Sequence, residues 1–168
     1  MIKKILISVA VMAVGFANCT VQNTQKFQGI SKQEIDSCVT PQSVACNYLL
    51  VSNDEKLRSL VTSEFYDELF DLALKSQCST ISKCLREGFR SKFTDEIAIT
   101  ESHVTDTDKV FGMYGEKSPY SGLPAYSVTF YGADSQGNIY DGHNNPKYQR
   151  TRILLVKKNG KWQVFMVK

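Results

Sequence analysis

Two apolar runs near the end of the chain are separated by Asn159-Gly160. The runs Arg150–Val156 and Trp162–Val167 are rich in β-branched and aliphatic residues, which is typical of strands. Asn-Gly is the preferred pair for a two-residue type I′ turn, because that turn needs positive φ at both central residues. The end of the chain is therefore predicted to be a β-hairpin.

The register of this hairpin follows from placing Lys158 opposite Lys161. Side chains alternate between the two faces of a strand, so the register decides which residues share a face. It predicts that one face of the hairpin is wholly apolar and must be covered by residues from upstream. That face would hold Leu155 opposite Val164 and Ile153 opposite Met166, with Trp162 beside them.

Upstream, hydroxyl residues precede apolar residues at helical spacing in three places. Thr40-Pro41, Thr62-Ser63 and Ser79-Thr80 each predict a helix start, since Thr and Ser are preferred N-caps and Pro suits the first turn. A short helix capped by Asp54 is expected between the first two. In the helix that begins after Thr62, we expect the buried face to carry Phe65, Leu69, Leu72 and Ala73.

The pattern changes to strands after about residue 97. Short strands are predicted at Ala98–Val104 and Lys109–Tyr114, with a turn between them, and a clearer strand begins at Tyr126. Residues 115–124 are predicted to be a loop, and a short strand is expected at 138–140. Helices followed by an antiparallel meander predict an α+β fold, with the N-terminal helices packed on one face of a curved antiparallel sheet.

The N-terminus resembles an export signal. Lys3 and Lys4 precede the apolar stretch Ile5–Phe16, which is too short to span a bilayer. Signal peptidase could cut after Ala17, leaving a soluble periplasmic protein. Alternatively, residues 16–19 resemble a bacterial lipobox, with Cys19 as the lipid-modified first residue. We expect a signal peptide at 1–18, a flexible tether at 19–32 and a single α+β domain at 33–168.

The chain has five cysteines. In an oxidising compartment cysteines pair to form disulfides, so an odd number leaves one thiol to explain. If Cys19 carries lipid, four remain for two disulfides: Cys38, Cys46, Cys78 and Cys84. Cys78 and Cys84 could close a local loop, or Cys38 could pair with Cys84 and Cys46 with Cys78. Some could also be free and buried. No metal site is predicted, because the spacings lack a C-x-x-C pair and neither histidine lies near them.

The stretches Thr40–Tyr48, Asp54–Leu57 and Leu60–Tyr66 are similar to the helical opening of nuclear-transport-factor-two-like domains, especially those of small bacterial envelope lipoproteins. The closing stretch Ile153–Phe165 looks like their final hairpin, in which a Gly-Lys-Trp turn is common. The resemblance covers roughly Pro41–Phe65 and Tyr126–Val167. It implies a cone of three helices wrapped by a strongly bent antiparallel sheet, with a cavity at the wide end.

These features favour an exported, lipid-anchored, non-enzymatic binding or structural module. It would lie on the periplasmic face of a membrane, the outer one favoured, or in the periplasm. The partner would be an envelope protein or a small ligand. No long basic run exists to follow a phosphate backbone, so nucleic acid is not expected. The alternative is a cavity enzyme of the isomerase, dehydratase or hydrolase type. His103, beside Glu101, and His143 are its candidate bases, and both are expected to be structural or surface residues.

No catalytic residue, cofactor or metal is therefore predicted. Two groups of residues remain of interest. The first is expected to line a cavity or the core and contains Tyr48, Phe65, Tyr126 and Trp162. The second lies in an aromatic-rich segment that we expect to bind a partner and contains Phe111, Met113, Tyr114 and Tyr120.

Overall fold

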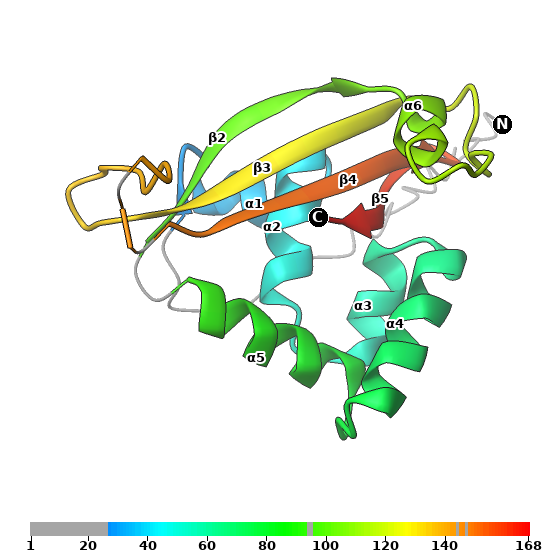
Figure 1. Cartoon of the computed structure of the whole chain (residues 1–168), viewed down its shortest axis with the longest axis horizontal. Coiled ribbons are helices and arrows are strands. Elements are labelled where there is room, and N and C mark those ends of the chain that lie inside the picture. Colours follow the sequence, from blue (N-terminus) through cyan, green and yellow to red (C-terminus); the bar gives the residue numbers. More distant parts are fainter. Residues whose placement is uncertain (1–26, 94–95, 144, 147) are drawn as a thin grey trace, which may run out of the picture.

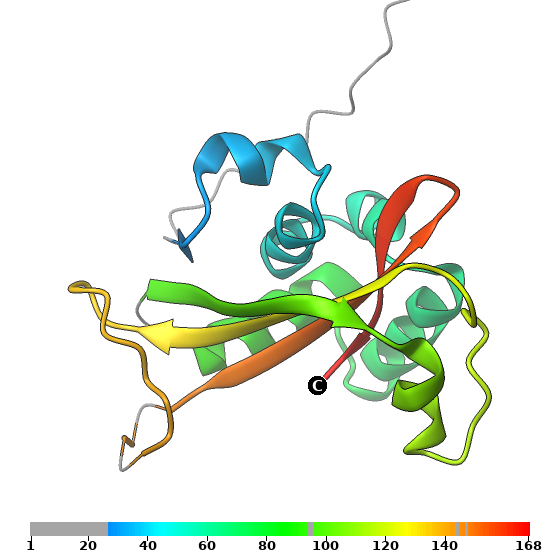
Figure 2. The same cartoon turned by 90° about the horizontal axis from the view of Figure 1, so that it is seen from above.

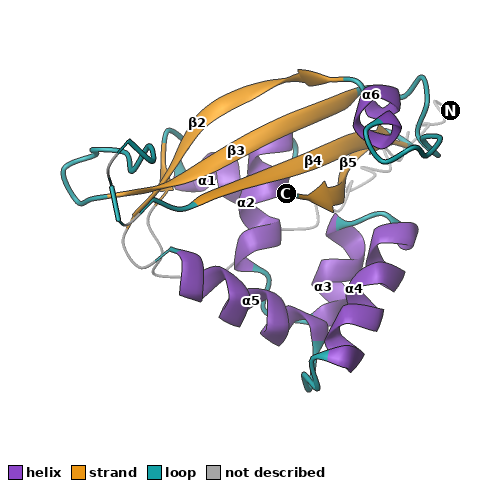
Figure 3. Cartoon of the chain, viewed as in Figure 1, coloured by secondary structure: helices purple, strands orange, loops and turns teal. Residues whose placement is uncertain are grey.

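In the described part of the chain, most helices come first and most strands follow them (Figures 1 and 3). The structure is a computed structural model that describes residues 27–93, 96–143, 145–146 and 148–168. Its elements are β1 (Phe27–Gln28), α1 (Lys32–Ser37), α2 (Pro41–Leu50), α3 (Asp54–Leu60), α4 (Ser63–Lys75), α5 (Ile81–Lys92), β2 (Glu96–Thr105), α6 (Thr107–Gly112), β3 (Ala125–Ala133), β4 (Arg150–Lys158) and β5 (Lys161–Val167).

The strands form one open five-stranded sheet in the order β1-β2-β3-β4-β5. Strand β1 runs parallel to β2, and all the other neighbours are antiparallel. The α+β prediction is confirmed. Strand β1 lies within the segment predicted to be a tether, and Phe27 packs against the main core. The main core lies between the inner face of the sheet and α1–α5, while α6 lies at one end of β2 and β3 (Figures 1 and 2).

The three predicted helix starts are confirmed, and each uses its threonine as the N-cap. Thr40 and Ser43 form a reciprocal capping box at α2, in which each side chain accepts a hydrogen bond from the other residue's backbone N–H. Thr62 caps α4 and Thr80 caps α5. Helix α4 buries Phe65 and other predicted residues, but Leu72 is 57% exposed and its prediction is wrong.

Asp54 does not cap the helix that it begins. Asn53 caps α3 by accepting a hydrogen bond from the Lys56 N–H at 2.8 Å. The Asp54 carboxylate instead accepts hydrogen bonds from the backbone N–H groups of Ile81 and Ser82, at 3.2 and 2.9 Å. It therefore satisfies the exposed donors at the start of α5 and ties α3 to α5.

The closing hairpin has the predicted turn. Asn159 and Gly160 both have positive φ, 52° and 78°, and Lys158 pairs with Lys161. Leu155 faces Val164 as predicted.

A β-bulge between Leu154 and Leu155 then changes the register. Ile153 faces Val167, and Met166 faces Leu154, so the predicted pairing of Ile153 with Met166 is wrong. A bulge adds a residue to one strand and so reverses which face the following side chains occupy. Met166 consequently leaves the main core and Val167 joins it.

The segment Lys109–Tyr114, predicted to be a strand, lies largely within helix α6. Asp106 caps this helix by accepting hydrogen bonds from the backbone N–H groups of Asp108 and Lys109. An aspartate just before a short apolar stretch can start a helix as well as a turn, and burial of Val110 on the outer face of the sheet decides the outcome. The resulting second core contains Val110, Tyr120, Leu154, Val156 and Phe165.

One of the two alternative disulfide arrangements is confirmed. Cys78 and Cys84 are bonded across the start of α5. Cys46 is free among the described cysteines and fully buried in the main core. Pairing of Cys46 with Cys78, and of Cys38 with Cys84, is therefore wrong. Burial raises the pKa of the Cys46 thiol, and a nearby Glu34 raises it further, so Cys46 behaves as a small core residue.

Candidate functional site

The four residues predicted to line a cavity or the core lie in two places. Tyr48 and Phe65 are both buried, with ring centroids 6.3 Å apart, and each contributes to the wall of a different hollow. Tyr126 and Trp162 make an edge-to-face contact at 6.0 Å and pack, half-buried, against the main core. The two pairs therefore lie in different surroundings, and the first pair borders the two hollows described next.

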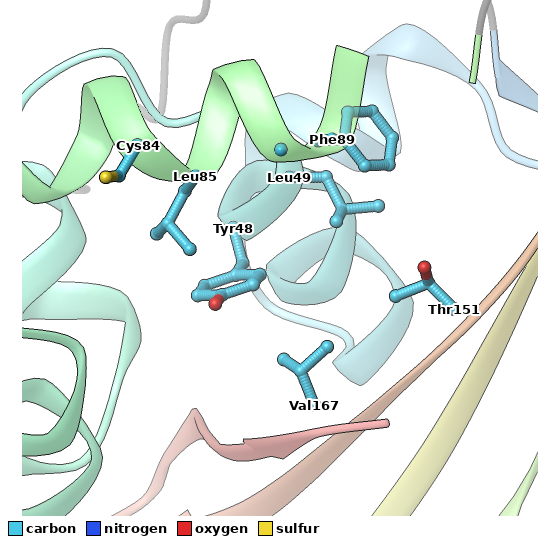
Figure 4. A pocket seen from close by; sticks show the side chains of 8 residues that line it. Tyr48, Leu49, Cys84, Leu85, Phe89, Thr151 and Val167 are labelled. Atoms are coloured by element: carbon cyan, nitrogen blue, oxygen red, sulfur yellow. The ribbon is translucent and has the colours of Figure 1, made fainter. Parts of the chain in front are cut away.

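The first hollow is a helix–sheet cavity of about 220 Å³ between α2, α5 and the strands β4 and β5. Figure 4 shows its side chains converging on one space, with α5 above and the strands below. The wall is mainly apolar, which suits a small hydrophobic ligand. The lining residues are Tyr48 and Leu49 from α2, Cys84, Leu85, Gly88 and Phe89 from α5, Thr151 from β4 and Val167 from β5.

Thr151 supplies a polar group without a partner to this apolar wall. The residue is 3% exposed, and its hydroxyl oxygen makes no hydrogen bond to any described residue. Buried hydroxyls are usually paired, because leaving one unpaired costs about 1–3 kcal/mol. The sequence carried a signal for this position. Thr151 is two and four residues before Ile153 and Leu155, so it is a polar residue in an otherwise apolar row.

The α5 wall of the cavity is held at its N-terminal end. The Cys78–Cys84 disulfide closes the segment leading into the helix, and Asp54 binds the backbone of its first turn. Farther along, a Cβ at Gly88 would meet no atom within 4 Å. The cavity wall is thus fixed at one end and has open space beside its middle.

The chemistry of the cavity suits binding better than acid–base catalysis. Burial raises the pKa of the Tyr48 hydroxyl, which therefore stays protonated. Cys84 is held in the disulfide. Among the described residues of the wall there is no carboxylate and no imidazole, and general acid–base catalysis relies on such groups.

The second hollow is an aromatic groove of about 350 Å³ at the end of the sheet beside α6. Three of the four residues predicted to bind a partner, Phe111, Tyr114 and Tyr120, line it. Phe111 stacks on Phe165 with ring centroids 6.0 Å apart. The fourth, Met113, is 70% exposed and faces a separate pocket.

Carboxylates surround this aromatic groove. The Tyr120 hydroxyl donates hydrogen bonds toward Thr62 at 2.9 Å and Glu64 at 3.2 Å. Burial and the nearby glutamates raise the pKa of Tyr120 to about 12. Burial, followed by repulsion from Glu116, raises the pKa of Glu68. Lys158 lies 3.7 Å from Glu64 and offsets part of this negative charge.

The two candidate bases of the enzyme alternative are both exposed. His103 faces the outer surface of the sheet, and Glu101 beside it lies 4.0 Å from the Arg152 guanidinium. His143 lies in a loop, where its backbone N–H donates to Asp141. The described part of the chain has no group of three or more potential metal-ligating side chains. Its helices include none with the length and apolar character needed to cross a bilayer.

The N-terminal predictions, including the signal peptide and lipid on Cys19, lie outside the described residues. Among the described cysteines, Cys38 is disulfide-bonded.

Comparison of the chain with protein-family models, with curated proteins and with solved structures gives no match. The geometry of the two hollows is therefore the basis for the functional argument.

Proposed function

We propose that the protein is an exported, non-enzymatic module that binds a small, mainly apolar molecule with one polar group in the helix–sheet cavity. The observation that carries the proposal is the unpaired Thr151 hydroxyl in an otherwise apolar wall. A ligand hydroxyl or carbonyl could pair with it, and the ligand's apolar part would fill the rest. A dry cavity of about 150 Å³ holds benzene, so about 220 Å³ suits a small ring or a short alkyl chain.

The Cys78–Cys84 disulfide supports export, because disulfides persist in oxidising compartments such as the periplasm. Helices on one face of an open sheet, with a hollow between the layers, are compatible with a nuclear-transport-factor-two-like cone. We propose that the fold is such a cone and that the protein lies in the bacterial envelope.

The proposal leaves two modes of export, which differ at Cys19. Lipid on Cys19 would anchor the domain to a membrane. The alternative is a soluble periplasmic protein cut after Ala17. Cys19 lies outside the described residues.

Intact-mass analysis of the mature protein, with and without reductant, separates the two alternatives. A diacylglycerol-modified N-terminal Cys19 would establish the anchor. A mature N-terminus at Asn18 would refute it.

Ligand binding is tested with two probes of nearly equal shape, toluene and benzyl alcohol, followed by NMR of backbone amides. Both should shift the amides of Leu85, Phe89 and Thr151 in a saturable way. Thr151→Val should weaken benzyl alcohol about fivefold, the effect of one hydrogen bond of about 1 kcal/mol. It should leave toluene unchanged or slightly tighter.

A blocking variant supplies the second arm of the test. Gly88→Leu should abolish both titrations, because it adds a side chain to the cavity wall. Glu87→Leu is the matched control on the same helix, since Glu87 is exposed and does not line the cavity. Shifts that survive Gly88→Leu, or the absence of any shift in the native protein, would refute binding in the helix–sheet cavity.

A further inference from the structure

A third hollow lies on the opposite face of the sheet from the helix–sheet cavity. This basic pocket of about 270 Å³ is bounded by β2, β3, β4 and α6. Strand pairing places His103, Ser127 and Leu154 in one row across the sheet. The row belongs to the outer face, because Leu154 packs in the second core with Val110 of α6.

Ser127 contributes a buried hydroxyl group to this pocket. It is 1% exposed, and its hydroxyl oxygen has no hydrogen-bond partner within the described part of the chain. It lines the basic pocket. A hydroxyl can both donate and accept a hydrogen bond, so a ligand oxygen at this position would satisfy it.

Three cationic side chains line the same pocket, Lys109 from α6, Arg152 from β4 and Lys168 at the end of β5. Arg152 is held in place, since its Nε lies 3.4 Å from the Thr129 hydroxyl. The Lys168 ammonium lies 4.9 Å from the centre of the Tyr114 ring. Cationic residues from three separate parts of the chain therefore line the same pocket as one buried hydroxyl.

The side-chain carboxylates of Asp106 and Glu101 oppose part of this positive charge. Asp106 lines the pocket, but one of its oxygens already accepts the two backbone N–H groups that it caps. Glu101 lies 4.0 Å from Arg152 and is about half exposed. A contact at that distance in solvent is weak, so Arg152 remains able to bind an anion.

We propose that the basic pocket binds a phosphate group. A phosphate presents several acceptor oxygens and a charge of up to −2, so it can meet a guanidinium, ammonium groups and a hydroxyl from different directions. The Ser127 hydroxyl would donate a hydrogen bond to one phosphate oxygen, and Arg152 and Lys109 would contact the other oxygens. This site is separate from the helix–sheet cavity, so either can exist without the other.

The test is an NMR titration of the mature protein with inorganic phosphate and methyl phosphate, at constant ionic strength set with chloride. Saturable shifts are expected at the amides of Ser127, Leu154 and α6. Ser127→Ala should weaken binding about tenfold, the effect of one hydrogen bond to a charged group, without lowering the melting temperature. Lys109→Gln should also weaken binding. Lys83→Gln is the matched control, because Lys83 is an exposed lysine on α5.

The Ser127 variant separates binding from a structural role. If Ser127 is needed for the fold, the Ser127→Ala variant should be less stable than the native protein. If its hydroxyl instead binds the ligand, the variant should lose only phosphate affinity. Absence of saturable shifts, or equal phosphate affinity in Ser127→Ala and the native protein, would overturn the proposal. An equal loss of affinity in Lys83→Gln and Lys109→Gln would also overturn it, by showing unspecific attraction.

Vesicles identify the source of the phosphate once binding is established. Sedimentation with phosphatidylglycerol vesicles but not phosphatidylcholine vesicles, competed by methyl phosphate, would identify a lipid headgroup. Phosphate binding without sedimentation would identify a soluble phosphate ester. Both outcomes support a phosphate site in the basic pocket.

Discussion

Replacement of Thr151 by valine should make the protein more stable. Valine has nearly the shape of threonine, with a methyl group in place of the hydroxyl. Thr151 is 3% exposed, and its hydroxyl has no partner among the described residues. Removing an unpaired buried hydroxyl recovers about 1–3 kcal/mol of lost solvation. Because the cavity has some access to solvent, we expect a gain near the lower end, about 1–2 kcal/mol.

The assay is urea unfolding of the oxidised protein, followed by the fluorescence of Trp162, its single tryptophan. Unfolding entropy of about 2.1 cal/mol/K per residue also predicts a rise in melting temperature of roughly 3–7 °C. The midpoint should rise without a change of slope, since the surface exposed on unfolding is nearly the same.

Thr62→Val is the matched control. Thr62 is 1% exposed and equally buried, but its hydroxyl oxygen accepts hydrogen bonds from the Phe65 N–H and the Tyr120 hydroxyl. Loss of a helix cap and of one side-chain hydrogen bond should cost about 2 kcal/mol. The same substitution is thus expected to raise the free energy of unfolding at Thr151 and to lower it at Thr62. A loss of stability in Thr151→Val would show that its hydroxyl is paired, by water for example, and would refute the reasoning.

Three further predictions concern the covalent and backbone constraints. Reduction of the Cys78–Cys84 disulfide, which joins residues six apart, should lower the free energy of unfolding by about 2 kcal/mol, measured by urea unfolding against a Cys78→Ser/Cys84→Ser variant. Burial raises the pKa of Asp54, but hydrogen bonds from the start of α5 outweigh it and lower the pKa below 3.8. Its stabilising effect should therefore be complete above pH 3.8 and be lost as the pH falls through the lowered pKa. In a pH series of unfolding curves, Asp54→Asn should remove that part of the acid sensitivity, and an unchanged profile would contradict the assignment. Gly88→Ala should stabilise α5 by about 1 kcal/mol, whereas Gly160→Ala should destabilise the hairpin by about the same amount or more, because Gly160 has a φ of 78°. Thermal melts of the two alanine variants test this difference, since a new Cβ meets no atom within 4 Å at either position.

Local chemistry in the sequence was enough to predict the helix starts and the turn of the hairpin. Thr40 and Thr62 cap helices with their own side chains, and Asn159-Gly160 adopts the conformation that few other pairs tolerate. These outcomes depend on residues within three or four positions of one another. The Cys78–Cys84 bond joins residues six apart, and the sequence left it as one of two alternatives.

Features that depend on distant residues were not predictable in the same way. Asp54 caps a helix that begins 27 residues later, and nothing near Asp54 in the sequence indicates it. Cys46 remains free because α2 turns it into the main core, away from an oxidised partner. Helix α6 forms where a strand was predicted, because Val110 is buried against the outer face of β4.

The residues of the candidate sites show the same difference between local and distant information. Tyr48 and the aromatic residues Phe111, Tyr114 and Tyr120 were found from their residue type, and each does border a hollow. The two unpaired hydroxyls, Thr151 and Ser127, were missed. A polar residue in a strand becomes informative only when the structure shows what surrounds it.

The bulge in β5 connects the two faces of the sheet. With a regular ladder, Met166 would face Ile153 in the main core and Val167 would point to the outer face. The bulge exchanges them, so Val167 reaches the wall of the helix–sheet cavity and Met166 packs with the second core. This local change of register therefore decides which side chains border the hollows on each face. Bulges are common beside functional sites because they redirect side chains without changing strand order. Deletion of Phe165 would restore a regular ladder in which Met166 still faces Leu154 and Val167 still faces Ile153. It should therefore remove an aromatic ring from the aromatic groove and leave the wall of the helix–sheet cavity in place.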